Sequence, residues 1–414
     1  MNLELLFCII NFLLFFALDI FLFRGKKNQI LKLIVTVWAV SAFTGIFYFL
    51  NPFSALPYDV SIWPFIFLFS CFFICLLPFT KTNEATLEKK EFVYNIKLFN
   101  ITATLVALCA FEPFVEILYS IDQRGLVELG NAYAELTSGL TESRSNFSSI
   151  GRILYSFEEY MKFITIPLFF TYLTIENKRK IILIGLGCAA FMPSLQNMVH
   201  GERYYVMITT FSFVFNFLMF KTRLSTEVKD KLIMYGIATA IILSVLFVSI
   251  SITRFGKDST YDQEYGTAYQ FIRYFGESYT RFNTEVWHLE NFQNGTFSLA
   301  SFYNYFYGMD IDIEENNFKL GFVSNNFYTF IGDFFIDFGY YTLPILAILS
   351  FMFYRFINNR KTFITLGDIF LINIYANILL FGIVYFIYRN GFIHMLWAII
   401  LSIVFNSVSS FSKR

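Results

Sequence analysis

Three charged residues in the segment QFIRYFGESYTRFNTEVWH, residues 270–288, are spaced four residues apart. On a helix, Arg273, Glu277 and Arg281 would lie within about 80° of one another. An arginine fork recognises phosphate and carboxylate groups with fixed geometry, and a neighbouring carboxylate can accept a proton. The spacing therefore predicts one helix face suited to binding an anion and moving a proton.

The same segment also has an apolar side. Phe271, Phe275 and Phe282 fall opposite the charges, so the helix could lie on a bilayer with these rings in the acyl boundary and its cations at headgroup level. In the structural alternative the charges only form ion pairs worth about 0.2–0.5 kcal/mol each. Gly276 weakens the prediction of a continuous helix.

A second candidate is the stretch MVHGERYY, residues 198–205, between two long apolar runs. A tight turn needs only small polar residues, and it does not require His200, Glu202 and Arg203 together. We therefore take Arg203 as a candidate phosphate ligand and His200 as a candidate proton acceptor. The alternative is an ordinary polar turn.

A third candidate is SNNFYTFIGDFFIDFGYY, residues 324–341, where Asp333 and Asp337 are one helical turn apart among aromatic residues. A carboxylate in apolar surroundings loses hydration, which suits it to accept a proton. We place Asp337 among the candidate catalytic residues and Asp333 among the substrate-binding ones. The alternative is a helix N-cap, where negative charge is favoured.

Other charged residues lie at the ends of apolar runs. Glu112 and Glu116 end one run and either join such a site or pair with Arg124 or Arg144. Arg254 ends another run and is a further candidate phosphate ligand.

The composition indicates the elements that must position these residues. Hydrophobic residues make up 56% of the chain and charged residues 15%, whereas soluble domains carry about 25% charged residues. The apolar runs are long enough to cross a bilayer. The sequence predicts a single all-α polytopic membrane domain with about eleven spans: 3–23, 31–50, 62–80, 98–119, 160–175, 181–198, 204–220, 232–252, 335–357, 366–388 and 391–411.

Lysine and arginine clusters follow the odd-numbered spans. The positive-inside rule then places the N-terminus outside and the C-terminus in the cytoplasm. Two segments on the outer side are longer than simple turns, residues 120–159 and 253–334. The second is too aromatic for disorder, so we expect it to fold against the outer membrane face.

Several function classes are disfavoured. The net charge of zero gives no sign of nucleic-acid binding, and the chain has no nucleotide-binding or HExxH metalloprotease motif. Its five cysteines lie in apolar runs, as small buried hydrophobes do. We expect no cofactor and no metal, and a substrate that is external or borne by the membrane.

With these features assembled, the chain resembles the oligosaccharide repeat-unit polymerases of O-antigens and capsules (Wzy type), which are related to O-antigen ligases. The resemblance rests on the layout of the whole chain and on three stretches: HGERYY, RYFGESYTRFN and FYTFIGDFFIDFGY. It implies a GT-C-like glycosyltransferase of the bacterial inner membrane that works at the periplasmic face, with membrane lipid around it.

The resemblance also implies the reaction. An acceptor hydroxyl on one lipid-linked repeat unit attacks the anomeric carbon of a glycan on undecaprenyl pyrophosphate, which leaves. Arginines stabilise the leaving pyrophosphate without a metal, and Arg203, Arg254, Arg273 and Arg281 are the candidates. Glu277, His200 and Asp337 are the candidate bases. A chain-length regulator and a flippase are expected partners.

Three other functions remain open. An O-antigen ligase would use the same donor, and layout alone does not separate it from a polymerase. A flippase or transporter of lipid-linked glycan usually has paired repeats and polar residues at the midplane, whereas here the polar residues gather at one face. A membrane acyltransferase should show His or Arg motifs in its cytoplasmic loops, which here carry mainly lysines.

Overall fold

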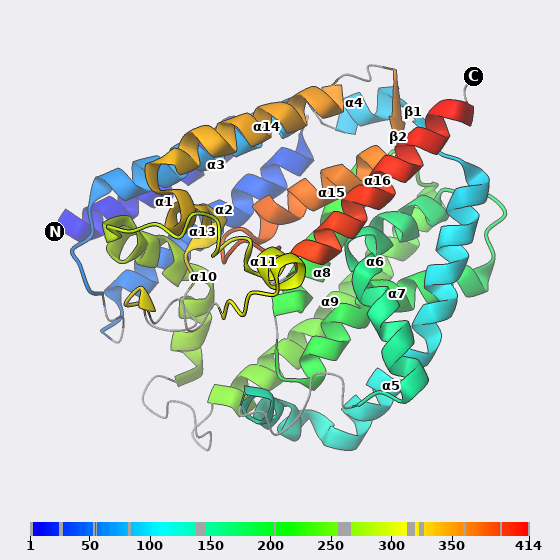
Figure 1. Cartoon of the computed structure of the whole chain (residues 1–414), viewed down its shortest axis with the longest axis horizontal. Helices are drawn as coiled ribbons and strands as arrows, with labels where there is room; N and C mark the ends of the chain where they lie inside the picture. Colours follow the sequence, from blue (N-terminus) through cyan, green and yellow to red (C-terminus); the bar gives the residue numbers. More distant parts are fainter. Residues whose placement is uncertain are drawn as a thin grey trace. The chain divides into compact units, whose positions relative to one another are not determined.

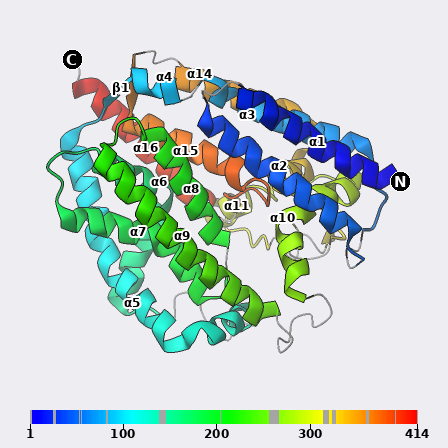
Figure 2. The same cartoon turned by 180° about the vertical axis from the view of Figure 1, so that it is seen from behind.

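The computed structural model describes residues 3–24, 28–52, 54, 56–81, 84–137, 146–202, 204–255, 266–312, 319–322, 327–358, 362–389 and 391–412. The described chain is mostly helical (Figure 1 and, from behind, Figure 2). Two short strands, β1 (Glu91–Val93) and β2 (Phe363–Thr365), pair with each other. The helices are α1 (Leu3–Arg24), α2 (Gln29–Leu50), α3 (Ile62–Lys81), α4 (Glu84–Lys89), α5 (Ile96–Thr137), α6 (Ser149–Leu173), α7 (Lys180–Val199), α8 (Tyr204–Phe220), α9 (Thr226–Phe255), α10 (Gly266–Thr284), η1 (Val286–His288), α11 (Ala300–Tyr307), α13 (Thr329–Phe338), η2 (Gly339–Tyr341), α14 (Thr342–Asn358), α15 (Leu366–Phe381) and α16 (Phe392–Ser412).

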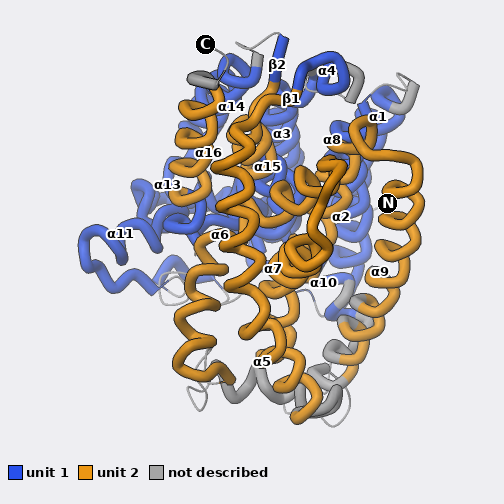
Figure 3. The backbone as a smooth tube through the Cα atoms, turned by 90° about the vertical axis from the view of Figure 1, so that its right-hand side faces the viewer, with its two compact units in different colours: residues 1–91, 268–363, 375–395 blue, residues 92–267, 364–374, 396–414 orange. Residues whose placement is uncertain are grey.

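The chain forms two compact units (Figure 3). Unit 1 comprises residues 1–91, 268–363 and 375–395, and unit 2 comprises residues 92–267, 364–374 and 396–414. Each unit therefore assembles from segments far apart in the sequence.

Unit 1 is held together by aromatic residues. Trp38 of α2 is fully buried, stacks on Phe72 of α3 at 4.3 Å between ring centroids, and donates through Nε1 to the Leu379 carbonyl at 2.7 Å. Helix α14 packs along α3, as Figure 1 shows. Tyr340, just before α14, lies by Phe67 near the start of α3, so the two helices begin at the same end of the unit.

Unit 2 is built on close crossings between helices. Gly185 of α7 faces α5, where an added Cβ would come within 2.6 Å of the Ala107 backbone oxygen. The Glu116 carboxylate of α5 accepts a hydrogen bond from the Ser148 backbone N–H at 3.2 Å, next to the start of α6. Glu112 contacts the Ser148 hydroxyl at 3.5 Å. These two glutamates thus bind Ser148, the residue that caps α6. The side chains of the predicted alternative partners, Arg124 and Arg144, lie outside the described residues.

Seven of the described helices are long and apolar enough to cross a membrane, so the chain is a multi-pass membrane protein. The prediction of a polytopic all-α membrane fold is confirmed, while the count of eleven spans stays a prediction. The seven candidate spans are Leu3–Leu22, Gln29–Leu50, Ile62–Thr80, Ile96–Gln123, Lys180–Val199, Thr329–Ile357 and Phe392–Ser409.

Two predicted spans are interrupted or end earlier in the structure. The span 335–357 is interrupted at Gly339, whose φ of 55° ends α13 and leaves room for Phe292, since a Cβ there would lie 2.3 Å from that ring. The span 366–388 stops as a helix at Phe381. The chain then turns back, and the Gly382 carbonyl accepts a hydrogen bond from the Phe330 N–H at 2.8 Å.

Helix α5 is longer than the predicted span 98–119 and takes up much of the predicted loop 120–159. The apolar run ends near residue 119, but the residues that follow include several Ala, Leu and Glu, which favour helix. The backbone therefore continues as a helix beyond the apolar run.

Candidate functional site

Helix α10 crosses α2 at very short range. An added Cβ at Gly276 would lie 2.6 Å from the backbone of Thr44, so only glycine fits there. Ser41 of α2 donates its hydroxyl to the Phe275 carbonyl at 2.6 Å, and the Tyr279 hydroxyl donates to the Trp38 carbonyl at 3.0 Å. The helix therefore runs unbroken through Gly276, which holds the crossing instead of breaking the helix.

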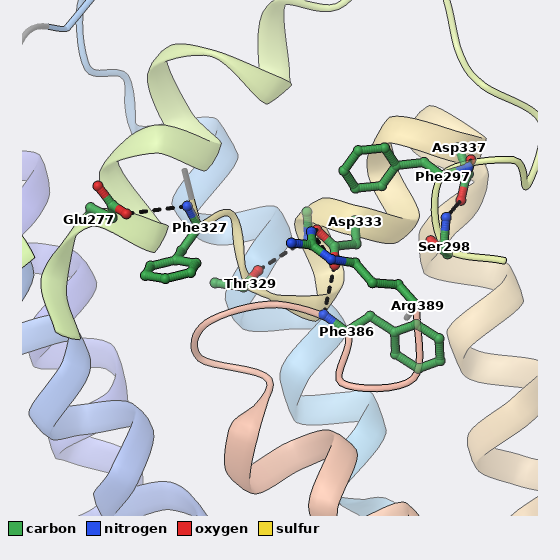
Figure 4. Close-up of polar contacts among 10 residues, drawn as sticks. Glu277, Phe297, Ser298, Phe327, Thr329, Asp333, Asp337, Phe386 and Arg389 are labelled. Atoms are coloured by element: carbon green, nitrogen blue, oxygen red, sulfur yellow. Dashed lines mark hydrogen bonds and ion pairs between the residues drawn. The ribbon is translucent and has the colours of Figure 1, made fainter. Parts of the chain in front are cut away.

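Two ion pairs lie along α10 and the residue that follows it. We call these four residues the α10 ladder: Arg273, Glu277, Arg281 and Glu285. The Arg273 Nε donates to Glu277 at 2.9 Å, and the Phe327 backbone N–H donates to the other Glu277 oxygen at 3.3 Å (Figure 4). Arg281 pairs with Glu285, and its Nε donates to the Tyr48 hydroxyl at 3.0 Å. The predicted spacing thus brings three candidate residues together.

The two arginines of the ladder differ in exposure. The Arg273 side chain is 27% exposed, whereas the Arg281 side chain is 6% exposed and its partner Glu285 is also buried. A ligand can therefore reach the Arg273 guanidinium more readily than that of Arg281.

Glu277 is fully buried. Burial raises the pKa of its carboxyl above the ordinary value, and the neighbouring Arg273 guanidinium opposes that rise. Pairing with arginine alone would lower this pKa, so desolvation is the larger effect here.

The apolar face of α10 packs inside unit 1. Phe282 is fully buried, with Trp287 at 6.1 Å and Phe335 of α13 at 5.6 Å between ring centroids. The interpretation of Phe282 as a ring in the acyl boundary is therefore wrong, because these aromatic residues cover it. The Phe271 side chain lies outside the described residues.

Asp333 of α13 binds the turn that follows α15. Its carboxylate accepts a hydrogen bond from the Phe386 N–H at 2.7 Å and lies 3.4 Å from the Arg389 guanidinium (Figure 4). That guanidinium also lies 4.3 Å from the centre of the Tyr385 ring, a cation–π arrangement. Arg389 is not among the predicted ligands, since it lies 56 residues from Asp333 and next to a predicted span.

Asp337 holds a different loop. One carboxylate oxygen accepts the backbone N–H groups of Gly295 and Phe297 at 3.0 and 2.9 Å, and the other accepts that of Ser298 at 2.7 Å. Asp337 is fully buried. Three charge-assisted hydrogen bonds from one loop make this carboxylate an anchor for residues 295–298.

One aromatic contact links the α10 ladder with the Asp333–Arg389 pair. The Phe327 N–H reaches Glu277, and the Phe327 ring stacks on Tyr385 at 6.1 Å between centroids. Tyr385 in turn lies against Arg389. Both charged groups thus belong to one network within unit 1.

In unit 2, the stretch MVHGERYY forms the turn that the sequence permits, with Gly201 at a φ of 70°. His200 is buried, and its Nε2 lies 3.0 Å from the Gln196 side-chain nitrogen, which in turn donates to Asn146. An amide nitrogen can only donate, so His200 Nε2 acts as the acceptor. This uses the lone pair that would otherwise take up a proton.

The same turn leads into a contact that the sequence did not predict. Lys162 of α6 donates to the Tyr205 hydroxyl at 2.7 Å. The candidate phosphate ligand Arg203 lies outside the described residues, and so does the side chain of Arg254, a residue of α9.

The charged groups described above in unit 1 are arginines and carboxylates. Within the described part of the chain, no three His, Cys, Asp or Glu side chains are grouped so that they could hold a metal ion. The arrangement in unit 1 can bind an anion at Arg273, whose guanidinium is oriented by a buried carboxylate.

Comparisons of the chain with family models, curated proteins and solved structures found no match.

Proposed function

We propose that this protein polymerises oligosaccharide repeat units carried on undecaprenyl pyrophosphate, at the periplasmic face of the bacterial inner membrane. The observation that carries the proposal is the α10 ladder, in which a part-exposed arginine is oriented by a fully buried glutamate. The ladder lies in the long segment that the sequence predicts to be periplasmic.

The proposed reaction is a glycosyl transfer. The acceptor hydroxyl oxygen forms a bond to the anomeric carbon of the donor, while the bond from that carbon to the pyrophosphate oxygen breaks. The hydroxyl proton passes to a base, and undecaprenyl pyrophosphate leaves with the bonding electron pair. Negative charge grows on the pyrophosphate, so a cation placed beside it lowers the barrier.

In this proposal Arg273 binds the leaving pyrophosphate. Its side chain is 27% exposed, which is compatible with a ligand, and the bond from its Nε to Glu277 orients the guanidinium. Glu277 is a positioning residue, because both of its oxygens accept hydrogen bonds and none of its surface is exposed. Arg281 supports the helix through Glu285 and Tyr48. The carboxylates of unit 1 discussed above already accept hydrogen bonds, so the proposal assigns no base.

The test is the surface glycan of a strain that lacks this protein. The expected result is a single repeat unit on the acceptor lipid, with no longer chains. Expression of the protein from a plasmid should restore the full range of chain lengths. Absence of all glycan from the lipid A core would instead indicate a ligase. Repeat units that accumulate on the cytoplasmic side would indicate a flippase.

A further inference from the structure

Helix α11 presents a bare aromatic surface. Tyr305, Phe306 and Tyr307 are 64%, 54% and 68% exposed, and Met309, just after the helix, is exposed as well. Large apolar side chains that stand together in water carry a free-energy cost, and such patches mark interaction sites. We call these four residues the α11 patch.

The patch is held in a fixed shape. Gly308 ends α11 with a φ of 63°. The Asn304 side chain then binds the returning chain twice, donating to the Ile311 carbonyl at 3.0 Å and accepting from the Ile311 N–H at 2.8 Å. The patch is therefore preorganised and does not depend on a partner to form.

The position of the patch follows from its attachments in unit 1. The loop just before α11 is anchored on Asp337, and the Ser301 hydroxyl accepts a hydrogen bond from the Phe392 N–H at 3.1 Å. Asp337 lies only a few residues before the exposed pair Tyr340 and Tyr341. Helix α11 is thus fixed at the end of the unit where α14 begins.

Exposed tyrosine and tryptophan residues gather at that same end. Among the described residues of unit 1 they are Tyr58, Trp63, Tyr305, Tyr307, Tyr340 and Tyr341. Trp63 lies at the start of α3, which begins beside α14, and Tyr58 stacks on His288, just after α10, at 4.4 Å between ring centroids. Tyrosine and tryptophan concentrate where a bilayer meets water.

The exposed apolar residues of α14 agree with a membrane boundary near Tyr341. Its exposed apolar residues begin at Ile348 and continue to Phe356. At 1.5 Å per residue, this exposed stretch rises about 12 Å, and Tyr341 lies about 10 Å before it, so both fit within a hydrocarbon core of about 30 Å. Arg355 in the last turn marks the opposite end. Tyr341 therefore lies close to one boundary of the core.

We propose that the α11 patch lies in the headgroup layer of the membrane and anchors this end of unit 1 to the lipid surface. The occupant is lipid because the patch continues the aromatic end of two candidate membrane spans. Its Phe306 and Met309 side chains also offer no hydrogen bond to a polar ligand. Anchoring there fixes the height of residues 295–298 and of Asp337 relative to the bilayer.

The test uses the full chain in vesicles of phosphatidylethanolamine and phosphatidylglycerol. A nitroxide label is attached at Phe306→Cys, in a background where Cys109 and Cys188 are alanine. Collision rates of the label are measured with oxygen, which partitions into lipid, and with a water-soluble nickel complex. The matched control is Asp310→Cys, an exposed position in the following turn, and Phe351→Cys on α14 serves as the lipid reference.

We expect the ratio of oxygen to nickel collisions at 306 to lie between the high value at 351 and the low value at 310. If Phe306→Cys does not fold, labels at Tyr305→Cys and Tyr307→Cys should give the same collision result. A label at 306 as open to nickel as the one at 310 would overturn the proposal. So would shielding from both reagents, or a label that is shielded only when soluble oligosaccharide is added, which would indicate a glycan site.

Discussion

The α10 ladder and helix α13 each contain two carboxylates on one helix face, yet they use them differently. In the ladder, Glu277 of α10 and Glu285 just after its end pair with arginines of α10. On α13, Asp333 and Asp337 reach across to backbone N–H groups of two other segments. The first arrangement orients cations, whereas the second ties loops to the fold.

This difference separates residues that can meet a ligand from residues that hold the scaffold. A carboxylate whose oxygens are filled by backbone donors has little capacity left for a substrate. An arginine that is oriented by a buried carboxylate but still part exposed keeps its charge available. By this criterion Arg273 is the residue of unit 1 best suited to binding, and Asp337 the one best suited to structure.

The largest effect should come from breaking the α13 anchor. Asp337→Ala leaves three N–H groups without their acceptor, and hydrogen bonds to a charged group contribute about 1.5–3 kcal/mol each. We expect little folded protein, measured as the monodisperse fraction in detergent. Asp337→Asn, which keeps one oxygen acceptor, should fall between this variant and the wild type.

The exposed Asp310→Ala serves as the control for Asp337→Ala, and it should fold as the wild type does. Normal yield and melting temperature for Asp337→Ala would remove the contrast between the two helices.

A smaller loss of stability should follow from Arg281→Ala. It leaves the buried Glu285 carboxylate without its cation, and breaking a buried pair from one side costs about 3–5 kcal/mol. We expect a lower melting temperature in a thermal ramp. The double variant Arg281→Met, Glu285→Leu should recover much of the loss, because it removes both charges together. Equal destabilisation in single and double variants would contradict the pairing.

The smallest effect concerns pH. The folded-state pKa of Glu277 is raised above its unfolded value, so the stability it contributes is fully present below the ordinary pKa of glutamate and is lost as the pH rises through the folded pKa. Glu277→Gln does not titrate. The melting temperature of the wild type relative to Glu277→Gln should therefore fall as the pH rises above the ordinary pKa of glutamate, about 4.3. A constant difference would show that Glu277 does not titrate above that pH.

The sequence predicts the membrane fold and the ladder, because both depend on local periodicity. Apolar runs reveal spans, and charges four residues apart reveal one helix face. The bounds of α13 and α15 are missed because they depend on Gly339 and on the turn after Phe381, and hydropathy does not detect either.

Contacts between distant segments also cannot be predicted from local sequence patterns. Nothing local indicates that Asp333 meets Arg389, or that Lys162 meets Tyr205, because each pair is brought together only by packing of distant segments. Burial of Phe282 is missed for the same reason, since an amphipathic helix can place its apolar face against protein or against lipid.

The central claim is that Arg273 binds the leaving pyrophosphate, and polymerisation by the purified full chain tests it most directly. The assay follows chain growth from synthetic repeat units on undecaprenyl pyrophosphate, with melting temperature measured in parallel. We predict that Arg273→Ala lowers kcat by about 100-fold or more in protein that is still folded, although its melting temperature falls because the buried Glu277 loses its cation. Arg273→Lys should restore only part of the rate because lysine lacks the two-point fork. Growth of polymer at the wild-type rate by folded Arg273→Ala protein would contradict the account.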